Sequence, residues 1–106
     1  LKKLKQLKMK TQFTKGKWIE IIHDYIKGEI FIYCNEKPII RIAINNYATK
    51  SEAKANAKLI SAAPDLFEAL INIENDDNRI PSTIWEMRNK AINKALGEEI
   101  FKTKAE

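Results

Sequence analysis

Apolar and polar positions alternate with a period of two over residues 18–45, the spacing expected of half-buried β-strands. The alternation is partial in Trp18–His23 and regular in Glu29–Cys34. Turn-forming residues separate the runs, at Lys27-Gly28 and again in the cluster Asn35–Pro38. The pattern therefore predicts three short strands joined by tight turns, an antiparallel meander. Isoleucines and one cysteine share the faces that we expect to form the core: Ile30, Ile32, Cys34, Ile40, Ile42 and Ile44.

The period changes to that of an α-helix at Thr49, where the four residues Thr49–Glu52 match a capping box. Alanines, together with Leu59 and Ile60, continue the helical pattern as far as Pro64. We expect a kink or break there, because proline disfavours helical geometry in the residue before it. Beyond it the chain supplies a second apolar stripe: Leu66, Phe67, Leu70, Ile71 and Ile73.

A polar loop, Asn75–Asn78, precedes the final helix. Thr83 and Glu86 again have capping-box spacing, and Gly97 is well placed as the C-terminal cap. The predicted fold class is α+β: a short antiparallel β-meander of about three strands, followed by two to three α-helices packed on one sheet face. The last helix carries two adjacent rows, the first with Ile84, Met87, Ala91 and Ala95, the second with Trp85, Arg88, Ile92 and Leu96.

The first ten residues, LKKLKQLKMK, differ from the rest of the chain in being strongly basic. Residues 1–8 carry four lysines and no acid, so without them the net charge falls from +5 to +1. We therefore divide the chain into a basic N-terminal extension, residues 1–10, and a single α+β domain, residues 11–106. The extension could form an amphipathic helix or stay a frayed terminus, and Met9 could be an alternative start. Its candidates for contact with a phosphate backbone are Lys2, Lys3, Lys5 and Lys8.

The rest of the composition indicates the cellular compartment and the kind of genome that encodes the protein. Cys34 is the only cysteine, so the chain can form neither an internal disulfide nor a thiolate zinc site, which fits a reducing cytoplasm. No run approaches the ~18 apolar residues of a membrane span, and no apolar segment of a secretory signal follows the basic N-terminus. The 17 isoleucines, 16 lysines and 9 asparagines, with no valine, indicate an AT-rich bacterial or phage genome. We expect a cytoplasmic protein of a bacterial host cell.

Residues that could support catalysis are sparse. His23 is the only histidine, and Asp24 beside it would point to the opposite face of a strand, which favours a polar strand end over a general base. Asp76 and Asp77 lack the spacing of a calcium loop, and loop solvation explains them better. No glycine pattern that could cradle a phosphate occurs. The sequence therefore predicts a binding protein without enzymatic activity, metal or cofactor.

Aromatic and arginine residues offer a binding surface instead. Arg41 lies in sequence among the aromatic residues of the predicted strands, and such a face could stack a base or serve cross-strand packing. Trp85 and Arg88 could form a protein-binding hot spot, or belong to the core and its rim. Arg41, Arg79 and Arg88 are candidates for binding phosphate, because the guanidinium fork matches phosphate oxygens. The aromatic residues near the strands are Trp18, Tyr25, Phe31, Tyr33 and Tyr47.

Two motifs carry a resemblance to a known group of proteins. The helical segment Glu52–Leu70, EAKANAKLISAAPDLFEAL, resembles a pattern of small phage and prophage proteins, NAKLI-x-AAP-[DE]-LLEAL. In those proteins an FTKGKW-like opening, here Phe13–Trp18, leads into short strands, and a final helix ends near Ala-Leu-Gly, here Ala95–Gly97. The resemblance covers nearly all residues after Met9 and departs from the pattern at Phe67, where leucine is more typical.

The resemblance implies a phage or prophage origin and a counter-defence role, because proteins of this size and setting include anti-CRISPR inhibitors and sponges for nucleotide immune signals. Our leading hypothesis is an anti-CRISPR inhibitor that binds a Cas effector, for example an RNA-targeting type VI effector, or its guide RNA. The alternatives are a sponge that sequesters a nucleotide signal, and an accessory structural or regulatory protein. We also predict a homodimer, formed through exposed sheet edges or through the row with Trp85, Ile92 and Leu96.

Overall fold

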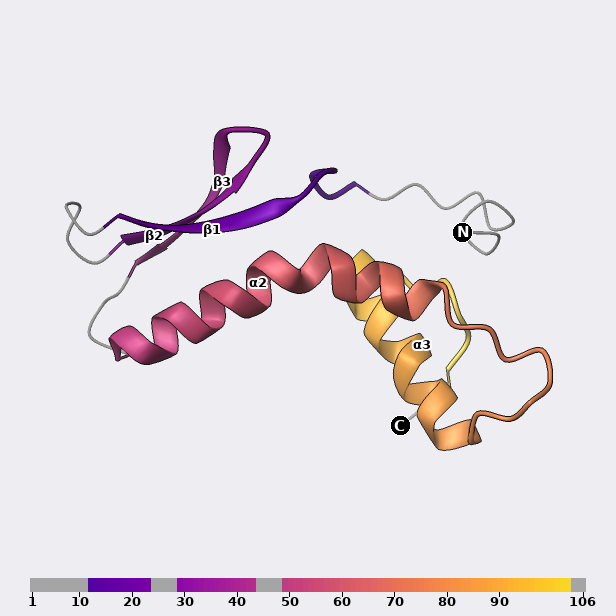
Figure 1. Ribbon diagram of the computed structural model, residues 1–106. Coiled ribbons are helices and arrows are strands. Elements are labelled where there is room, and N and C mark those ends of the chain that lie inside the picture. The colour runs from indigo at the N-terminus through magenta and orange to yellow at the C-terminus, as the bar shows by residue number, and fades with distance from the viewer. Residues whose placement is uncertain (1–11, 24–28, 44–48, 104–106) are drawn as a thin grey trace. The chain divides into compact units, whose positions relative to one another are not determined.

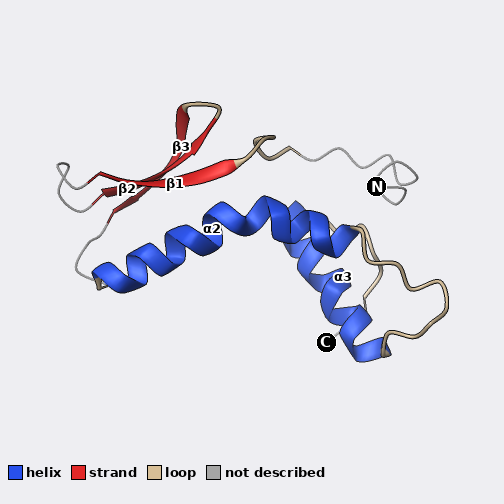
Figure 2. Ribbon diagram, viewed as in Figure 1, coloured by secondary structure: helices blue, strands red, loops and turns tan. Residues whose placement is uncertain are grey.

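The structure, a computed structural model, describes residues 12–23, 29–43 and 49–103 (Figure 1). Three strands are followed by two helices in these residues (Figure 2), which confirms the predicted α+β fold class. The strands are β1 (Trp18–His23), β2 (Glu29–Cys34) and β3 (Lys37–Ala43), and the helices are α2 (Lys50–Ile71) and α3 (Ser82–Leu96).

The described residues form two compact units. Residues 13–65 contain the sheet and most of α2, whereas the chain from Leu66 onward contains the end of α2 and all of α3. The predicted extension, residues 1–10, lies outside the described residues, so its separation from a domain of residues 11–106 stays a prediction. No helix in the described ranges is both long and apolar enough to cross a membrane.

The sheet is an antiparallel meander in the order β1-β2-β3, as predicted. Asn35 and Glu36 form the two-residue turn between β2 and β3, and both have positive φ angles, 52° and 66°, as a type I′ turn requires. The sequence cluster predicted a longer turn, but Lys37 and Pro38 already belong to β3. Pro38 can join the ladder because β3 is an edge strand, where a missing N–H is tolerated.

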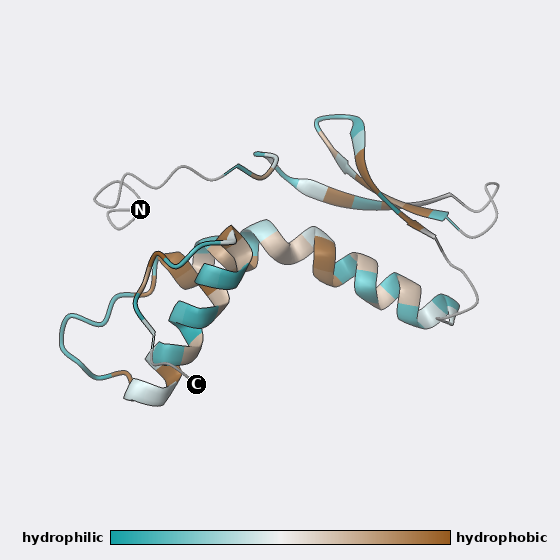
Figure 3. Cartoon of the chain, turned by 180° about the vertical axis from the view of Figure 1, so that it is seen from behind, coloured by the Kyte–Doolittle hydropathy of each residue, from teal (hydrophilic) through white to brown (hydrophobic). Residues whose placement is uncertain are grey.

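The core of the first unit lies between the sheet and α2. Half-buried and buried residues alternate along β2, and Ile30, Ile32 and Cys34 are the buried ones, as predicted. Ala53 and Ala57 of α2 complete the buried cluster with Ile30 and Ile32, because their small side chains let the helix approach the sheet closely. Ile44, also expected in the core, lies outside the described residues. Figure 3 shows hydrophobic positions recurring along the strands and α2. Half-buried residues pack around the cluster: Trp18, Ile39, Ile40, Ile42 and Ile60.

The first turn of α2 is capped as predicted. The hydroxyl of Thr49 accepts a hydrogen bond from the backbone N–H of Glu52 at 3.1 Å. Of the kink or break expected at Pro64, the break is absent, because α2 continues with Pro64 inside it, and the kink stays a prediction. A proline in a helix interior lacks an N–H donor and costs about 3 kcal/mol. The burial of Phe67 and Ile71 in the turns that follow helps to offset this cost.

The two ends of α3 show one wrong and one confirmed prediction. The helix begins at Ser82 with Pro81 at the N-cap and no side-chain cap, so the predicted capping box at Thr83 and Glu86 is wrong. Thr83 cannot cap because the chain is already helical one residue before it. Gly97 ends the helix as predicted, with a φ of 73°, and its N–H donates to carbonyls of the last turn at 2.9 and 3.3 Å.

Candidate functional site

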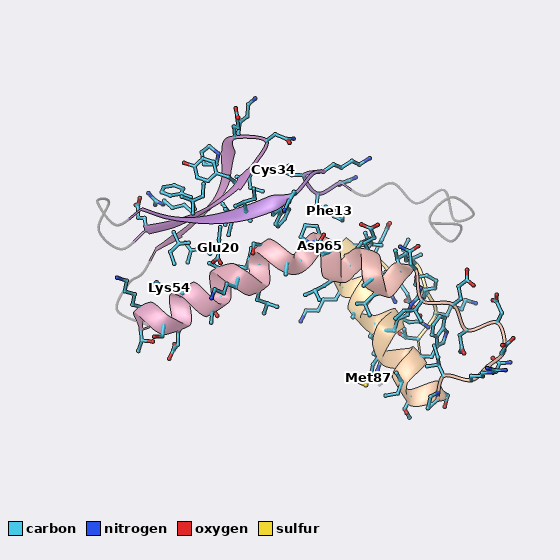
Figure 4. The ribbon with its side chains drawn as sticks, viewed as in Figure 1. Phe13, Glu20, Cys34, Lys54, Asp65 and Met87 are labelled. Atoms are coloured by element: carbon cyan, nitrogen blue, oxygen red, sulfur yellow. The ribbon has the colours of Figure 1, made fainter. Side chains whose placement is uncertain are left out.

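The surface that we single out is the face of the sheet turned away from the core. Ile30 and Ile32 point into the core, and β1 pairs Glu20 with Ile32, so Glu20 shares the inner face. Figure 4 shows Glu20 on the side of β1 that faces α2. Because neighbouring strand residues point to opposite faces, the residues between these positions form what we call the outer sheet face: Ile19, Ile21, Phe31, Tyr33 and Arg41.

The outer sheet face is apolar at its centre and exposed. Register places Ile19 opposite Tyr33 and Ile21 opposite Phe31. The side chains of Ile19 and Ile21 are 50% and 39% exposed, values that are high for isoleucine in a strand. The rings of Phe31 and Tyr33 meet edge to face, with centroids 6.2 Å apart and an interplanar angle of 66°. Their half-burial leaves part of each ring on the surface.

Arg41 supplies the charge of the outer sheet face. It lies opposite Phe31 in the β2–β3 register, and its Nη1 approaches Oε1 of Glu29 at 3.3 Å. The Arg41 side chain is 64% exposed, so this ion pair contributes little to stability and leaves the guanidinium accessible to a partner. The structure therefore brings together Phe31, Tyr33 and Arg41, three residues that the sequence suggested as a binding surface.

The other aromatic residues of that prediction do not join this face. Trp18 pairs with Cys34 and lies on the inner side, where its Nε1–H donates to the carbonyl of Thr14 at 3.0 Å. Tyr25 and Tyr47 lie outside the described residues. The four lysines suggested for phosphate contact lie outside them as well: Lys2, Lys3, Lys5 and Lys8.

Glu20 is a notable residue that the sequence reasoning missed. One carboxylate oxygen of Glu20 is buried and has no hydrogen-bond partner among the described residues. Burying a polar atom in this way costs on the order of 1–3 kcal/mol. The sequence could have indicated this residue by its position in β1. Glu20 is a charged residue on the same strand face as Trp18, and its partner across the β1–β2 pair is the buried Ile32.

Arg88, a candidate for partner binding, is an internal cap of α2. Its side chain is buried, and its Nε and Nη2 donate to the carbonyls of Leu70 and Ile71 at 3.1 and 3.4 Å. Its Nη1 donates to Oδ1 of Asn89 at 2.6 Å. The last carbonyls of a helix have no intrahelical donors, and Arg88 donates to two of them. The Leu70 carbonyl also accepts the N–H of Ile73 at 3.3 Å. Burial lowers the pKa of Arg88 from its ordinary value.

Two aromatic rings cover the Arg88 guanidinium. Its central carbon lies 4.3 Å from the centroid of the Trp85 ring and 4.5 Å from that of Phe101, distances typical of cation–π contacts. Asn93 holds Phe101 in place, because its amide group donates to the Phe101 carbonyl at 2.7 Å and accepts from the Phe101 N–H at 3.0 Å. Trp85 and Arg88 therefore stabilise their own unit, and we leave both out of the proposed binding surface.

The two apolar rows of α3 differ in exposure. Ile92 is fully buried and Trp85 and Leu96 are half-buried, so the row suggested for a homodimer contacts its own unit. The other row is on the surface, with Ile84 52% and Met87 65% exposed. The sequence did not distinguish the rows, because both are apolar at helical spacing.

The polar loop before α3 holds the third arginine. Arg79 is strongly exposed and its Nε lies 3.6 Å from a carboxylate oxygen of Asp77. The Asn75 side chain closes the loop by accepting the N–H of Ile80 at 3.0 Å. A shallow hollow of about 330 Å³ lies over these residues and Glu74. Within the described residues no three His, Cys, Asp or Glu side chains are placed to hold a metal ion.

The FTKGKW opening forms a tight structural loop against β2. Cys34 donates a hydrogen bond from its Sγ to the carbonyl of Lys15 at 3.3 Å. Gly16 has a φ of 123°, and a Cβ placed on it would lie 2.8 Å from the Cys34 sulfur. The close approach of this loop therefore requires glycine at position 16.

Comparison with known proteins identifies a family that this chain matches. The family model described as Salmonella phage P22 protein Y8K6 matches residues 9–99. The matched range includes the FTKGKW loop, the sheet and both helices. No curated protein and no solved structure matches the chain.

Proposed function

We propose that the chain, which belongs to the family of Salmonella phage P22 protein Y8K6, is a counter-defence protein that acts by stoichiometric binding and not by catalysis. Its proposed target is a Cas effector of the bacterial host, and an RNA-targeting type VI effector in particular, with or without contact to the guide RNA. In this role the protein is an anti-CRISPR inhibitor.

The observation that carries the proposal is the exposed outer sheet face. Ile19 and Ile21 expose apolar surface beside the rings of Phe31 and Tyr33, and Arg41 borders them. Protein interfaces are enriched in aromatic residues and arginine and depleted of other charges at their centre. An exposed apolar patch on a small protein is a typical mark of an interaction site. This composition supports a protein partner.

Co-purification tests the proposal directly. The full chain is mixed with candidate Cas effectors of its host, each with and without guide RNA, and the complexes are separated by size. We expect a stable complex of defined stoichiometry with one effector, and inhibition of that effector's nuclease activity at equimolar protein. If no effector of the host forms a complex with the protein, the proposal is overturned.

Replacing Ile19 with aspartate should weaken the complex by about 30-fold or more, because a charge at the centre of an apolar interface loses at least about 2 kcal/mol of binding. The matched control is Ile84→Asp, since Ile84 is 52% exposed on α3, against 50% for Ile19. Titration calorimetry measures both affinities, and thermal unfolding checks that both variants fold. Equal weakening by the two substitutions would contradict the assignment of the outer sheet face.

The basic extension is the proposed site of guide-RNA contact. Each lysine that contacts a phosphate contributes about 0.9 to the slope of log affinity against log salt on duplex nucleic acid. Removal of residues 1–8, which carry four lysines, should therefore lower that slope by up to about 3.6. Affinity measured across a salt series, with and without these residues, checks the prediction. An unchanged slope would remove the extension from RNA contact.

A second candidate function, a sponge for a nucleotide immune signal, is favoured by one arrangement. Phe31, Tyr33 and Arg41 share the outer sheet face, where the rings could stack a base and the guanidinium could bind a phosphate. A panel of cyclic and linear nucleotides should then raise the unfolding temperature, and Phe31→Ala should abolish the shift. If no nucleotide shifts the transition, this candidate is excluded.

A further inference from the structure

The solvent side of α2 carries a second apolar row, opposite the one that faces the sheet. Ala53 and Ala57 form the buried side of the helix. Ala55, Leu59 and Ala62 lie on the other side, and Leu59 is 64% exposed. A surface helix normally carries one apolar stripe, and a helix that is apolar on two sides is usually covered on both. The second row is unrelated to the outer sheet face.

We propose that a second copy of this chain covers the row, with the two α2 helices antiparallel about a two-fold axis between Ile60 and Ser61. In a symmetric pair each residue faces the one equally far on the other side of the axis. Leu59 then faces Ala62 of the second copy, and Ala62 faces Leu59 of the second copy. A large side chain meets a small one in both places, which is the condition for close helix packing.

Charges beside the row select the same arrangement. Lys58 and Asp65 are seven residues apart, two turns of helix, and therefore flank the row on the same side. In the antiparallel pair Lys58 faces position 63 of the second copy, two residues from Asp65. At a rise of about 1.5 Å per residue, Lys58 and Asp65 of the second copy are therefore offset by about 3 Å along the helix axis. A parallel pair, with its two-fold axis along the helices, would place these residues of the two copies on opposite sides of the interface and form no Lys58–Asp65 pair.

Both charged residues are available for this contact. Lys58 and Asp65 are exposed, and neither has an ionic partner among the residues that the structure describes. The two-fold axis creates two identical Lys58–Asp65 pairs. These pairs set the direction and register of the helices, while Leu59 and the alanines supply the apolar contact.

Charge exchange tests the interface with the full chain. Sedimentation equilibrium over a wide concentration range should show a monomer–dimer equilibrium. Lys58→Asp places two acids opposite each other in both pairs and should weaken dimerisation by about tenfold, and Asp65→Lys should do the same with two bases. The double variant K58D/D65K restores opposite charges and should recover the affinity. Lys102→Asp, an exposed lysine outside α2, is the matched control and should have no effect.

Three results of these experiments would overturn the proposed dimer. A chain that stays monomeric at every concentration would overturn the proposal, as would a dimer that the single variants do not weaken or the double variant does not restore. Leu59→Asp provides a second measurement, because it should abolish the dimer while leaving the helical circular dichroism signal unchanged. A dimer that survives Leu59→Asp forms through another surface.

Discussion

Replacing Arg88 with alanine should lower the free energy of unfolding by about 3–5 kcal/mol. The substitution leaves the buried carbonyls of Leu70 and Ile71 without their side-chain donor, and it opens a gap between the rings of Trp85 and Phe101. The Leu70 carbonyl keeps its hydrogen bond from the Ile73 N–H at 3.3 Å, so the Ile71 carbonyl is the one left unsatisfied. An unsatisfied buried carbonyl costs about 1–3 kcal/mol, and the lost aromatic contacts add to this. Urea unfolding followed by circular dichroism and by tryptophan fluorescence measures the change.

The control for this prediction is Arg79→Ala. Arg79 is strongly exposed and its ion pair with Asp77 lies on the surface, so its loss should change stability by no more than about 0.5 kcal/mol. Arg88→Lys keeps the charge but not the planar fork that reaches two carbonyls and Asn89, so it should recover only part of the loss. An Arg88→Ala protein as stable as the Arg79→Ala protein would show that Arg88 does not stabilise the α2 C-terminus.

Local patterns predicted most of the fold because its elements depend on neighbouring residues. The alternation along β2 identified Ile30, Ile32 and Cys34 as buried, and the Thr49 cap and the Gly97 end followed from residue types suited to those positions. The chain does not break at Pro64, and the local rule for proline could not show this because it gives no weight to burial in the following turns. Tertiary burial can override a local preference of this size.

The candidate site was predictable only in part, because it depends on which strands pair and in what register. Phe31 and Tyr33 share a face by alternation within β2 alone, and this was evident from the sequence. Their neighbours Ile19 and Ile21, and the exclusion of Trp18, follow only from the β1–β2 register. A one-residue shift of that register would have placed Trp18 on the outer face and Ile19 in the core.

Arg88 could not be assigned from the sequence for a related reason. An arginine in a helix is normally a surface residue, and its acceptors here lie 17 and 18 residues earlier in the chain. Nothing in α3 itself indicates that the end of α2 will present two acceptor carbonyls to it. The sequence could not show which of the two apolar rows of α3 is buried for the same reason. The contact between Arg88 and the end of α2 buries the row that contains Arg88.

Replacing Gly16 with alanine should destabilise the protein by about 2–4 kcal/mol, from two separate causes. The φ of 123° at Gly16 is one that a residue with a side chain rarely adopts. In addition, the new Cβ would lie 2.8 Å from the sulfur of Cys34, which is buried and hydrogen-bonded to the Lys15 carbonyl and therefore has little room to move. Thermal and urea unfolding measure the combined loss.

Gly97 provides a control without a steric contact, and Cys34 provides the one that separates the two causes. Gly97 has a φ of 73°, but a Cβ placed on it would meet no atom within 4 Å, so Gly97→Ala should cost only the backbone term, about 1 kcal/mol. The excess at Gly16 contains the contact with Cys34 together with the higher backbone cost of a φ of 123°, which lies outside the left-handed region that Gly97 occupies. Cys34→Ala removes that sulfur, so in the double variant the steric part of the Gly16→Ala cost should disappear while the backbone part remains. If the effects of Gly16→Ala and Cys34→Ala are additive, the whole loss of stability in Gly16→Ala comes from the backbone. The FTKGKW loop then makes no tight steric contact with β2.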